Sequence, residues 1–215
     1  MTIAWNKLIG TIPMELGSLS KLLYFRVATN NLTGGIPPFL GNLSFLEIFF
    51  SASYNNLEGS ILESIGLLKS LSFFAVGVNK LNGMVPSSLY NLSSISALGF
   101  EVNQLSGALL ANIGLTLPNL KVFTLGDNKF YGPIPGSLCN ASKLQKIDIP
   151  QNNFMGSVLY GYSSICWLYS VPNLLILQQL DTLYLCGNHV RVVCESVNNS
   201  SVCAFKRILT TRSQE

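Results

Sequence analysis

The segment NNLTGGIPPFLGNLSFL, residues 30–46, contains the phrase that decides the fold, because versions of this phrase recur along most of the chain. NKLIGTIP begins at Asn6, NKLNGMVP at Asn79 and NKFYGPIP at Asn128. The asparagines that open the phrases follow one another at an almost constant interval, and they are Asn6, Asn30, Asn55, Asn79, Asn103, Asn128 and Asn152. Such a regular period predicts a solenoid, in which each repeat contacts only its neighbours.

A second pattern precedes these ladder asparagines, with apolar residues 8, 5 and 3 positions before each one. Leu120, Phe123 and Leu125 before Asn128 are an example. This spacing is the LxxLxLxxN of a leucine-rich repeat, in which alternate apolar side chains of a short strand enter the core. The sequence therefore predicts an α/β solenoid with a parallel concave sheet, short 3-10 or irregular convex segments, and about seven coils.

The copy before Asn55 departs from this spacing by one residue. We interpret the extra residue as a bulge or widened turn near Ser51 to Tyr54, with Leu46 and Phe49 keeping the apolar phase. The ladder asparagines are expected to satisfy backbone groups at the bend after each strand, because their amides both donate and accept hydrogen bonds.

The repeat rhythm divides the chain into three parts. Residues 1–156 carry six coils, and residues 157–190 are expected to hold an insertion or degenerate repeat followed by a seventh strand, Leu183 and Leu185 before Asn188. Residues 191–215 form a tail without the repeat pattern.

The phrase LxxLxLxxNxLxGxIPxxLGNLSxL resembles plant-type extracellular leucine-rich repeats, and residues 6–156 carry the resemblance. Residues 117–149 look like the receptor-kinase class that includes plant receptors for bacterial flagellin and elongation factor. The resemblance implies recognition of a peptide or protein ligand, with a co-receptor as a further partner, in defence signalling at the extracellular face of the plasma membrane.

The start MTIAWNKLIG lacks a basic segment followed by an apolar run, and no kinase motif occurs in the 215 residues. The sequence is therefore expected to be a fragment of a larger ectodomain, without signal peptide, membrane span or kinase. Two other readings remain open. One is a secreted inhibitor of a cell-wall-degrading enzyme, similar to plant repeat proteins that block polygalacturonases, and the other is a non-functional truncated receptor product.

Six asparagines satisfy the N-x-[ST] rule for glycosylation. They are Asn31, Asn42, Asn91, Asn140, Asn198 and Asn199. Asn42, Asn91 and Asn140 lie two repeats apart from one another in turn, so they should line one flank of the solenoid and leave the strand face open. The alternative is that NLS is simply the family consensus, whether or not a glycan is attached.

Four of the five cysteines cluster late in the chain, at Cys166, Cys186, Cys194 and Cys203. They allow three disulfide pairings and would cross-link the C-terminal region in an oxidising compartment. Cys139 stands apart and is expected to be a small buried residue. No spacing matches a zinc site, so no metal or other cofactor is expected.

Composition and motifs argue against several functions. The net charge is +3 and the basic residues are scattered, which disfavours nucleic-acid binding. The most apolar stretch, residues 165–177, is too short to span a bilayer. The single histidine, His189, is expected in a turn, and neither GxSxG nor GxxxxGK[ST] occurs, so no enzyme activity or catalytic residue is expected.

We therefore expect the outward side chains of the strands to bind the ligand. Aromatic residues there combine large contact area with few rotors, and charged residues set complementarity. The predicted ligand-binding residues are Tyr24, Arg26, Phe73, Glu101, Asp127, Lys146, Asp148 and Tyr184. Small residues between them, at Ala75, Gly77, Ala97, Gly99 and Gly126, would form a shallow trough for a peptide backbone, or else reflect drift at positions without a ligand.

Overall fold

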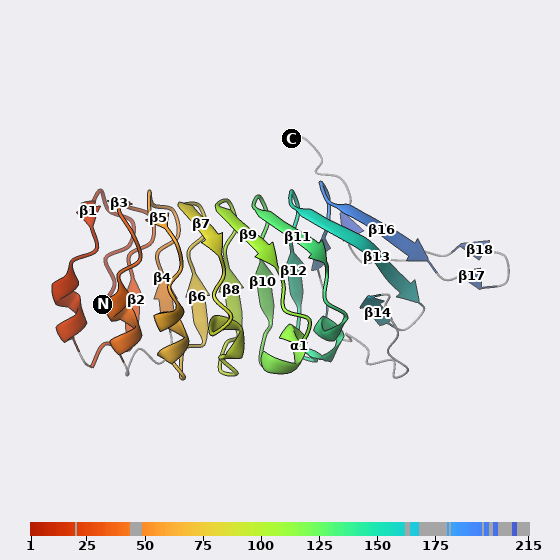
Figure 1. Ribbon diagram of the computed structural model, residues 1–215, viewed down its shortest axis with the longest axis horizontal. Helices are drawn as coiled ribbons and strands as arrows, with labels where there is room; N and C mark the ends of the chain where they lie inside the picture. The colour runs from red at the N-terminus through yellow and green to blue at the C-terminus, as the bar shows by residue number, and fades with distance from the viewer. Residues whose placement is uncertain are drawn as a thin grey trace.

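The chain forms an elongated stack of coils, and the strands of successive coils pair mainly in parallel (Figure 1). The computed structural model describes residues 1–19, 21–43, 49–161, 164–167, 180, 182–194, 196–197, 200–201 and 208–209. Side chains are described for these residues up to 157, except residue 42, and for 180 and 182–190.

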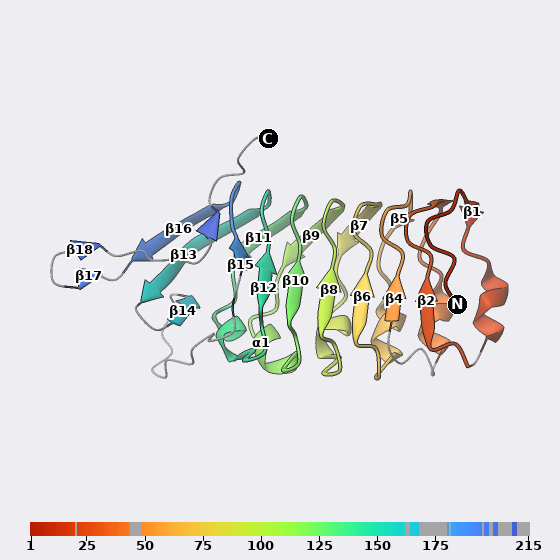
Figure 2. The same ribbon diagram turned by 180° about the vertical axis from the view of Figure 1, so that it is seen from behind.

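The LxxLxLxxN segments form one parallel sheet, here called the long sheet (Figure 2). Its strands, in spatial order, are β2 (Tyr24–Arg26), β4 (Phe49–Ser51), β6 (Phe73–Ala75), β8 (Ala97–Gly99), β10 (Val122–Thr124), β12 (Lys146–Asp148), β15 (Thr182–Tyr184) and β19 (Ile208–Leu209). Seven of these strands precede a ladder asparagine, and the predicted leucine-rich-repeat solenoid is confirmed.

The phrases after the ladder asparagines form further strands, which the sequence did not predict. They are β1 (Ile9–Thr11), β3 (Asn31–Thr33), β5 (Glu58–Gly59), β7 (Lys80–Met84), β9 (Gln104–Ala108), β11 (Lys129–Pro133) and β13 (Asn153–Gly161). β1 pairs with β3, while β5 to β13 form a second sheet with β14 (Ser164–Trp167) and β16 (His189–Cys194). His189 therefore begins a strand instead of lying in the expected turn.

Short helical turns connect the second-sheet strands to the next long-sheet strand. Five are 3-10 turns: η1 (Met14–Ser18), η2 (Pro38–Asn42), η3 (Glu63–Leu67), η4 (Leu89–Asn91) and η5 (Gly136–Asn140). The repeat from Asn103 to Asn128 is longer by one residue than the repeat on either side, and it forms an α-helical turn instead, α1 (Ile113–Thr116). There the Leu117 amide reaches back to the Ile113 carbonyl, while the Leu92 amide reaches only to Leu89, so the wider turn accommodates the extra residue.

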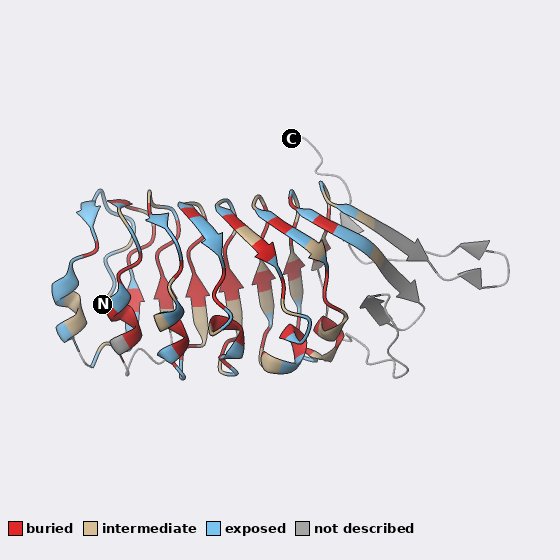
Figure 3. Ribbon diagram, viewed as in Figure 1, coloured by how far each residue is buried: buried red, intermediate tan, exposed pale blue. Residues whose placement is uncertain are grey.

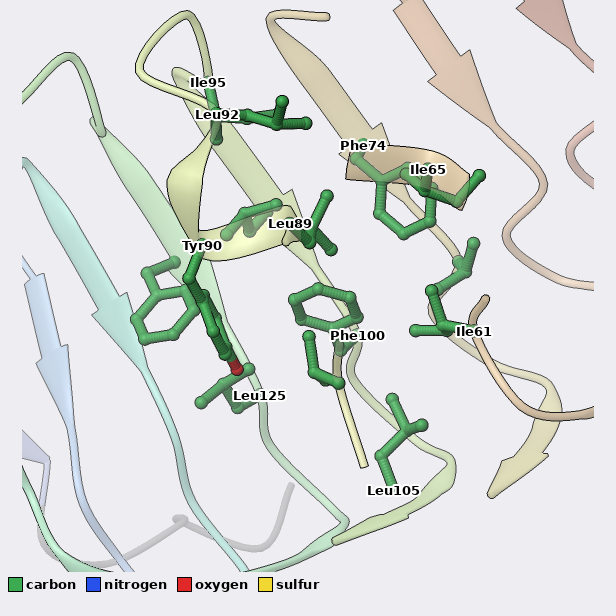
Figure 4. Close-up of a cluster of buried hydrophobic side chains, with 14 of the residues drawn as sticks. Ile61, Ile65, Phe74, Leu89, Tyr90, Leu92, Ile95, Phe100, Leu105 and Leu125 are labelled. Carbon is green, nitrogen blue, oxygen red and sulfur yellow. The ribbon is translucent and has the colours of Figure 1, made fainter. Parts of the chain in front are cut away.

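The core runs along the stack between the two sheets (Figure 3). Phe25, Phe50 and Phe74 are fully buried, and their rings stack with centroids 5.5 and 5.1 Å apart. Phe74 is followed by Phe100 at 5.9 Å. Each coil thus buries its aromatic or aliphatic side chains against those of the next coil (Figure 4).

The expected bulge near Ser51 to Tyr54 is wrong. β4 is in register with its neighbours, so that Phe50 pairs with Phe25 and Phe74, and Phe49 faces outward. η2 ends seven residues before β4, whereas η3 ends six residues before β6. The extra residue therefore lies between η2 and β4, where residues 44–48 are outside the description, and Leu46 is one of them.

The ladder asparagines satisfy backbone groups at the bends, as predicted, and all but Asn6, which bonds only to Ile3 and Ala4, also join successive coils. The Asn103 amide nitrogen donates to the carbonyls of Val76 and Phe100 at 3.1 and 3.0 Å. Its Oδ1 accepts from the Leu81 amide at 2.9 Å. Asn103 thus bonds to its own coil and the preceding one, and the others with this pattern are Asn30, Asn55, Asn79, Asn128, Asn152 and Asn188.

The residue before each ladder asparagine adopts a left-handed backbone conformation. Val78 and Val102, for example, both have φ of 54°. Gly187 adopts this conformation without steric cost, whereas the β-branched residues Thr29, Val78 and Val102 adopt it against their local preference. The repeated turn geometry is imposed by the hydrogen bonds of the ladder and not by local preference.

No helix among the described residues is long and apolar enough to cross a membrane. At the C-terminal end, β17 (Ser196–Val197) pairs antiparallel with β18 (Ser200–Ser201), and β19 pairs with β15.

Candidate ligand-binding surface

The outward side chains of the long sheet form two rows, because the strands pair in parallel and in register. The first row is Tyr24, Phe49, Phe73, Ala97, Val122, Lys146 and Thr182, and the second is Arg26, Ser51, Ala75, Gly99, Thr124, Asp148 and Tyr184. The middle residue of each of these strands is buried. We call the surface that carries both rows the outer face; it is the strand face from which recognition was predicted.

An aromatic patch occupies one end of the outer face, formed by Tyr24, Phe49 and Phe73. The Phe49 and Phe73 rings are stacked, with centroids 4.1 Å apart and planes 5° from parallel. Tyr24, the register partner of Phe49, is 46% exposed. Because Phe49 and Phe73 are only partly buried and Tyr24 is exposed, this patch can take up an apolar side chain of a partner.

Phe49 was missed as an outer-face residue because the apolar phase of the sequence was taken to place it in the core. A usable signal existed in the sequence: counting five residues back from Asn55, as in the other copies, reaches Phe50 and leaves Phe49 outside.

The middle of the outer face is not the open trough that small residues suggested. The Glu101 carboxylate lies over Gly77, where an added Cβ would collide with it, and accepts a hydrogen bond of 2.7 Å from the Thr124 hydroxyl. Pro150 covers Gly126 in the same way. Gly77 and Gly126 are therefore buried under side chains of the next coil, and the predicted trough is wrong at both positions.

A polar cluster occupies the other end. The Lys146 ammonium lies 2.9 Å from a carboxylate oxygen of Asp148 and 5.8 Å from the centre of the Tyr184 ring. The side chains of Lys146 and Asp148 are 39% and 26% exposed. The ion pair is thus accessible to a partner, and its own contribution to stability is small, about 0–1 kcal/mol.

The eight predicted ligand-binding residues do not form one site. Lys146, Asp148 and Tyr184 lie together, and Tyr24, Arg26 and Phe73 lie in the rows toward the other end. Glu101 follows β8 and lies outside the rows, with its carboxylate over Gly77. Asp127 lies outside them, in the left-handed position before Asn128. Whether any of the eight binds a ligand remains a prediction.

Among the residues that the structure describes, no group of three His, Cys, Asp or Glu residues could hold a metal ion. The outer face offers aromatic surface, one ion pair and one hydrogen-bonded carboxylate. This arrangement supplies contacts for a bound partner.

Three sequon asparagines lie away from the outer face. Asn91 and Asn140 end η4 and η5, and Asn31 begins β3. Asn31 and Asn91 are exposed. Asn42 ends η2, but its side chain is outside the description, as are Asn198 and Asn199. Attachment of glycans at these positions remains a prediction.

Cys139 is buried, as expected, but it is disulfide-bonded and does not stand apart from the other cysteines. Cys186 is a free thiol and is partly exposed. The pairing expected among the four late cysteines therefore does not include Cys186. The side chains of Cys166, Cys194 and Cys203 lie outside the description.

Comparison with known proteins gives consistent results. The family model described as Leucine Rich Repeat matches residues 119–141. No curated protein matches the chain. Among solved structures, a TDR receptor is 34% identical with a TM-score of 0.76, and it covers 88% of this chain. The plant peptide hormone receptor RGFR1, solved in complex with RGF2, is 30% identical with a TM-score of 0.76 over 88% of this chain.

A third structure is the leucine-rich-repeat ectodomain of the Arabidopsis receptor kinase HAESA, in complex with an extended IDA peptide hormone. It is 26% identical, with a TM-score of 0.77 over 88% of this chain. The chain spans only 30%, 28% and 30% of these three chains, respectively. The likeness thus extends over most of this chain but over less than a third of each receptor structure.

Proposed function

This chain is a run of leucine-rich repeats similar in sequence and fold to plant receptor-kinase ectodomains, and we propose that its outer face binds an extended peptide or protein segment. The fold is a recognition scaffold. RGFR1 and HAESA are receptors solved with peptide hormones, which supports the same class of ligand here.

The observation that carries the proposal is the alignment of the aromatic patch and the polar cluster along the two rows. From Phe73 in β6 to Lys146 in β12 there are three strand spacings. At about 4.8 Å each these amount to roughly 14 Å, the length of about four residues of extended chain. A peptide crossing the strands would place an apolar side chain on the Phe49–Phe73 stack and a charged one beside Lys146 and Asp148.

The finer assignments rest on resemblance. HAESA has also been solved with the co-receptor SERK1, which supports a co-receptor as a second partner of a full receptor containing this chain. We extend the proposal to the extracellular face of the plasma membrane, to defence signalling, and to glycans at the six sequons. We also propose that residues 1–156, 157–190 and 191–215 are distinct parts of the chain, and that it has no enzyme activity.

A peptide-display selection tests the proposal. The chain, secreted with an added signal sequence, would be used to select from a library of random linear peptides. We expect enriched peptides to carry an apolar residue and a charged residue about four positions apart. Their binding should weaken about tenfold or more in Lys146→Ala and remain unchanged in Lys129→Ala, which removes an exposed lysine from the second sheet. Equal binding by both variants would contradict the proposal.

A further inference from the structure

Glycines recur at one position of the helical turns, where neighbouring coils pack closely. They are Gly17, Gly41, Gly66 and Gly114. An added Cβ at Gly41, Gly66 or Gly114 would collide with a serine of the next coil. Glycine is required at these positions because the backbone of one turn approaches the next turn.

Tyr90 occupies the same position in η4, one repeat after Gly66 and one repeat before Gly114. A large side chain thus replaces the glycine at one place in the stack. The Tyr90 ring extends away from its own turn into the interior (Figure 4). The preceding coil forms a 3-10 turn with Gly66 at this position, so the 3-10 turn does not require the tyrosine.

The Tyr90 hydroxyl has no described partner although the side chain is almost completely buried. The residue is only 2% exposed, and no hydrogen bond joins its hydroxyl to any described residue. Burial raises the pKa of Tyr90 well above its ordinary value of 10, so the hydroxyl stays protonated and can donate. The hydroxyl oxygen is not among the fully buried polar atoms that lack a partner, so it remains accessible, and a ligand group that accepts a hydrogen bond from it can replace solvent there.

Tyr90 lines a pocket of about 420 Å³ between the second sheet and the helical turns. Met84, Leu110 and Phe130 contribute apolar walls, and Ser60 and Ser106 contribute hydroxyls. This volume is within the range of pockets for small molecules, which are mostly apolar with a few oriented polar groups. The pocket lies on the side opposite the outer face and shares none of the outer-face rows.

Glu63 also lines the pocket, and its side chain is exposed. A carboxylate at the edge disfavours anionic ligands, since like charges repel. No basic side chain lines the pocket to offset this charge.

We propose that this pocket binds a small neutral molecule with an apolar body and a carbonyl or similar acceptor, which accepts a hydrogen bond from the Tyr90 hydroxyl. The acceptor reaches inward to Tyr90, and the apolar body contacts Met84, Leu110 and Phe130. The site does not depend on peptide binding at the outer face.

The test uses two probes of the same shape, 2-tetralone and tetralin, of which only the first has a carbonyl. The chain has four methionines, so labelling the methionine methyl groups with ¹³C gives separate signals for Met1, Met14, Met84 and Met155. The Met84 signal reports on the pocket, and the other three report on non-specific effects. Each probe is titrated into the wild type, Tyr90→Phe and Ala108→Trp, whose new side chain would occupy the pocket wall.

We expect 2-tetralone to shift the Met84 signal with saturation and to bind about three- to tenfold more tightly than tetralin. Tyr90→Phe should abolish that difference, and Ala108→Trp should weaken both probes. Gln104→Trp, at the other end of β9, is the matched control and should bind like the wild type. An unshifted Met84 signal, or equal affinity for both probes in the wild type, would overturn the proposal. If Tyr90→Phe fails to fold, the affinities of the two probes for the wild type and for Ala108→Trp still test the proposal.

Discussion

Phe49 and Phe73 stack on the outer face with ring centroids 4.1 Å apart, while the next residues in the chain, Phe50 and Phe74, stack in the core at 5.1 Å. Two adjacent pairs of the same residue type thus have opposite environments. The inner pair stabilises the coil stack, and the outer pair leaves aromatic surface for a partner.

This arrangement predicts unequal costs for equal truncations. Phe50→Ala should lower the free energy of unfolding by about 3–5 kcal/mol, because a fully buried ring leaves a cavity. Phe49→Ala should lower it by about 1 kcal/mol or less, since the ring is partly exposed. Urea unfolding of the two variants measures the difference. Similar losses would mean that the register of β4 is wrong.

The asparagine ladder predicts a large effect at Asn103. Asn103→Ala leaves the Val76 and Phe100 carbonyls and the Leu81 amide without their partner. At about 1 kcal/mol each, the loss should be about 2–4 kcal/mol in urea unfolding. Asn82→Ala, which changes an exposed asparagine of β7, is the control and should change stability by less than about 0.5 kcal/mol.

The left-handed backbone conformation of Val102 predicts that a substitution there would stabilise the protein. Val102 has φ of 54° and is 43% exposed, so Val102→Gly relieves strain with little loss of burial. The relief of about 1–2 kcal/mol exceeds the entropic cost of glycine, about 0.5–1 kcal/mol, so thermal stability should rise. Gln104→Gly, in the regular strand β9, should instead lower it. A loss of stability in both variants would show that the strain is absent.

The cysteines make a prediction about covalent structure. β14, which contains Cys166, contacts η5, which contains Cys139. We therefore expect mapping of unreduced peptides to find Cys139 joined to Cys166, and Cys139→Ala to cost about 2–4 kcal/mol. Cys186 should be alkylated in the folded protein. A different partner for Cys139, or an unreactive Cys186, would refute this assignment.

The period of the sequence was sufficient to predict the long sheet and the asparagine ladder, because both depend on residues that repeat in every coil. The second sheet was missed because each phrase such as NKLNGMVP is short and rich in glycine and proline, which are typical of turns. The assignment of Phe49 failed because FLEIFF, residues 45–50, offers several apolar phases.

The position of the Glu101 side chain could not be predicted from the sequence. Gly77 and Glu101 are one repeat apart, so the sequence places them in neighbouring coils. It does not give the direction in which a flexible side chain points, and that direction decides whether the glycine is open.

The most direct test of the central claim is the dissociation constant of one selected peptide for the wild type, Tyr24→Ala and Tyr131→Ala. Both tyrosines are about half exposed, at 46% and 51%, but Tyr24 lies on the outer face and Tyr131 on the second sheet. Binding at the outer face predicts a dissociation constant about tenfold or more higher in Tyr24→Ala, and unchanged in Tyr131→Ala. Unchanged affinity in Tyr24→Ala, or an equal loss in both variants, would contradict it.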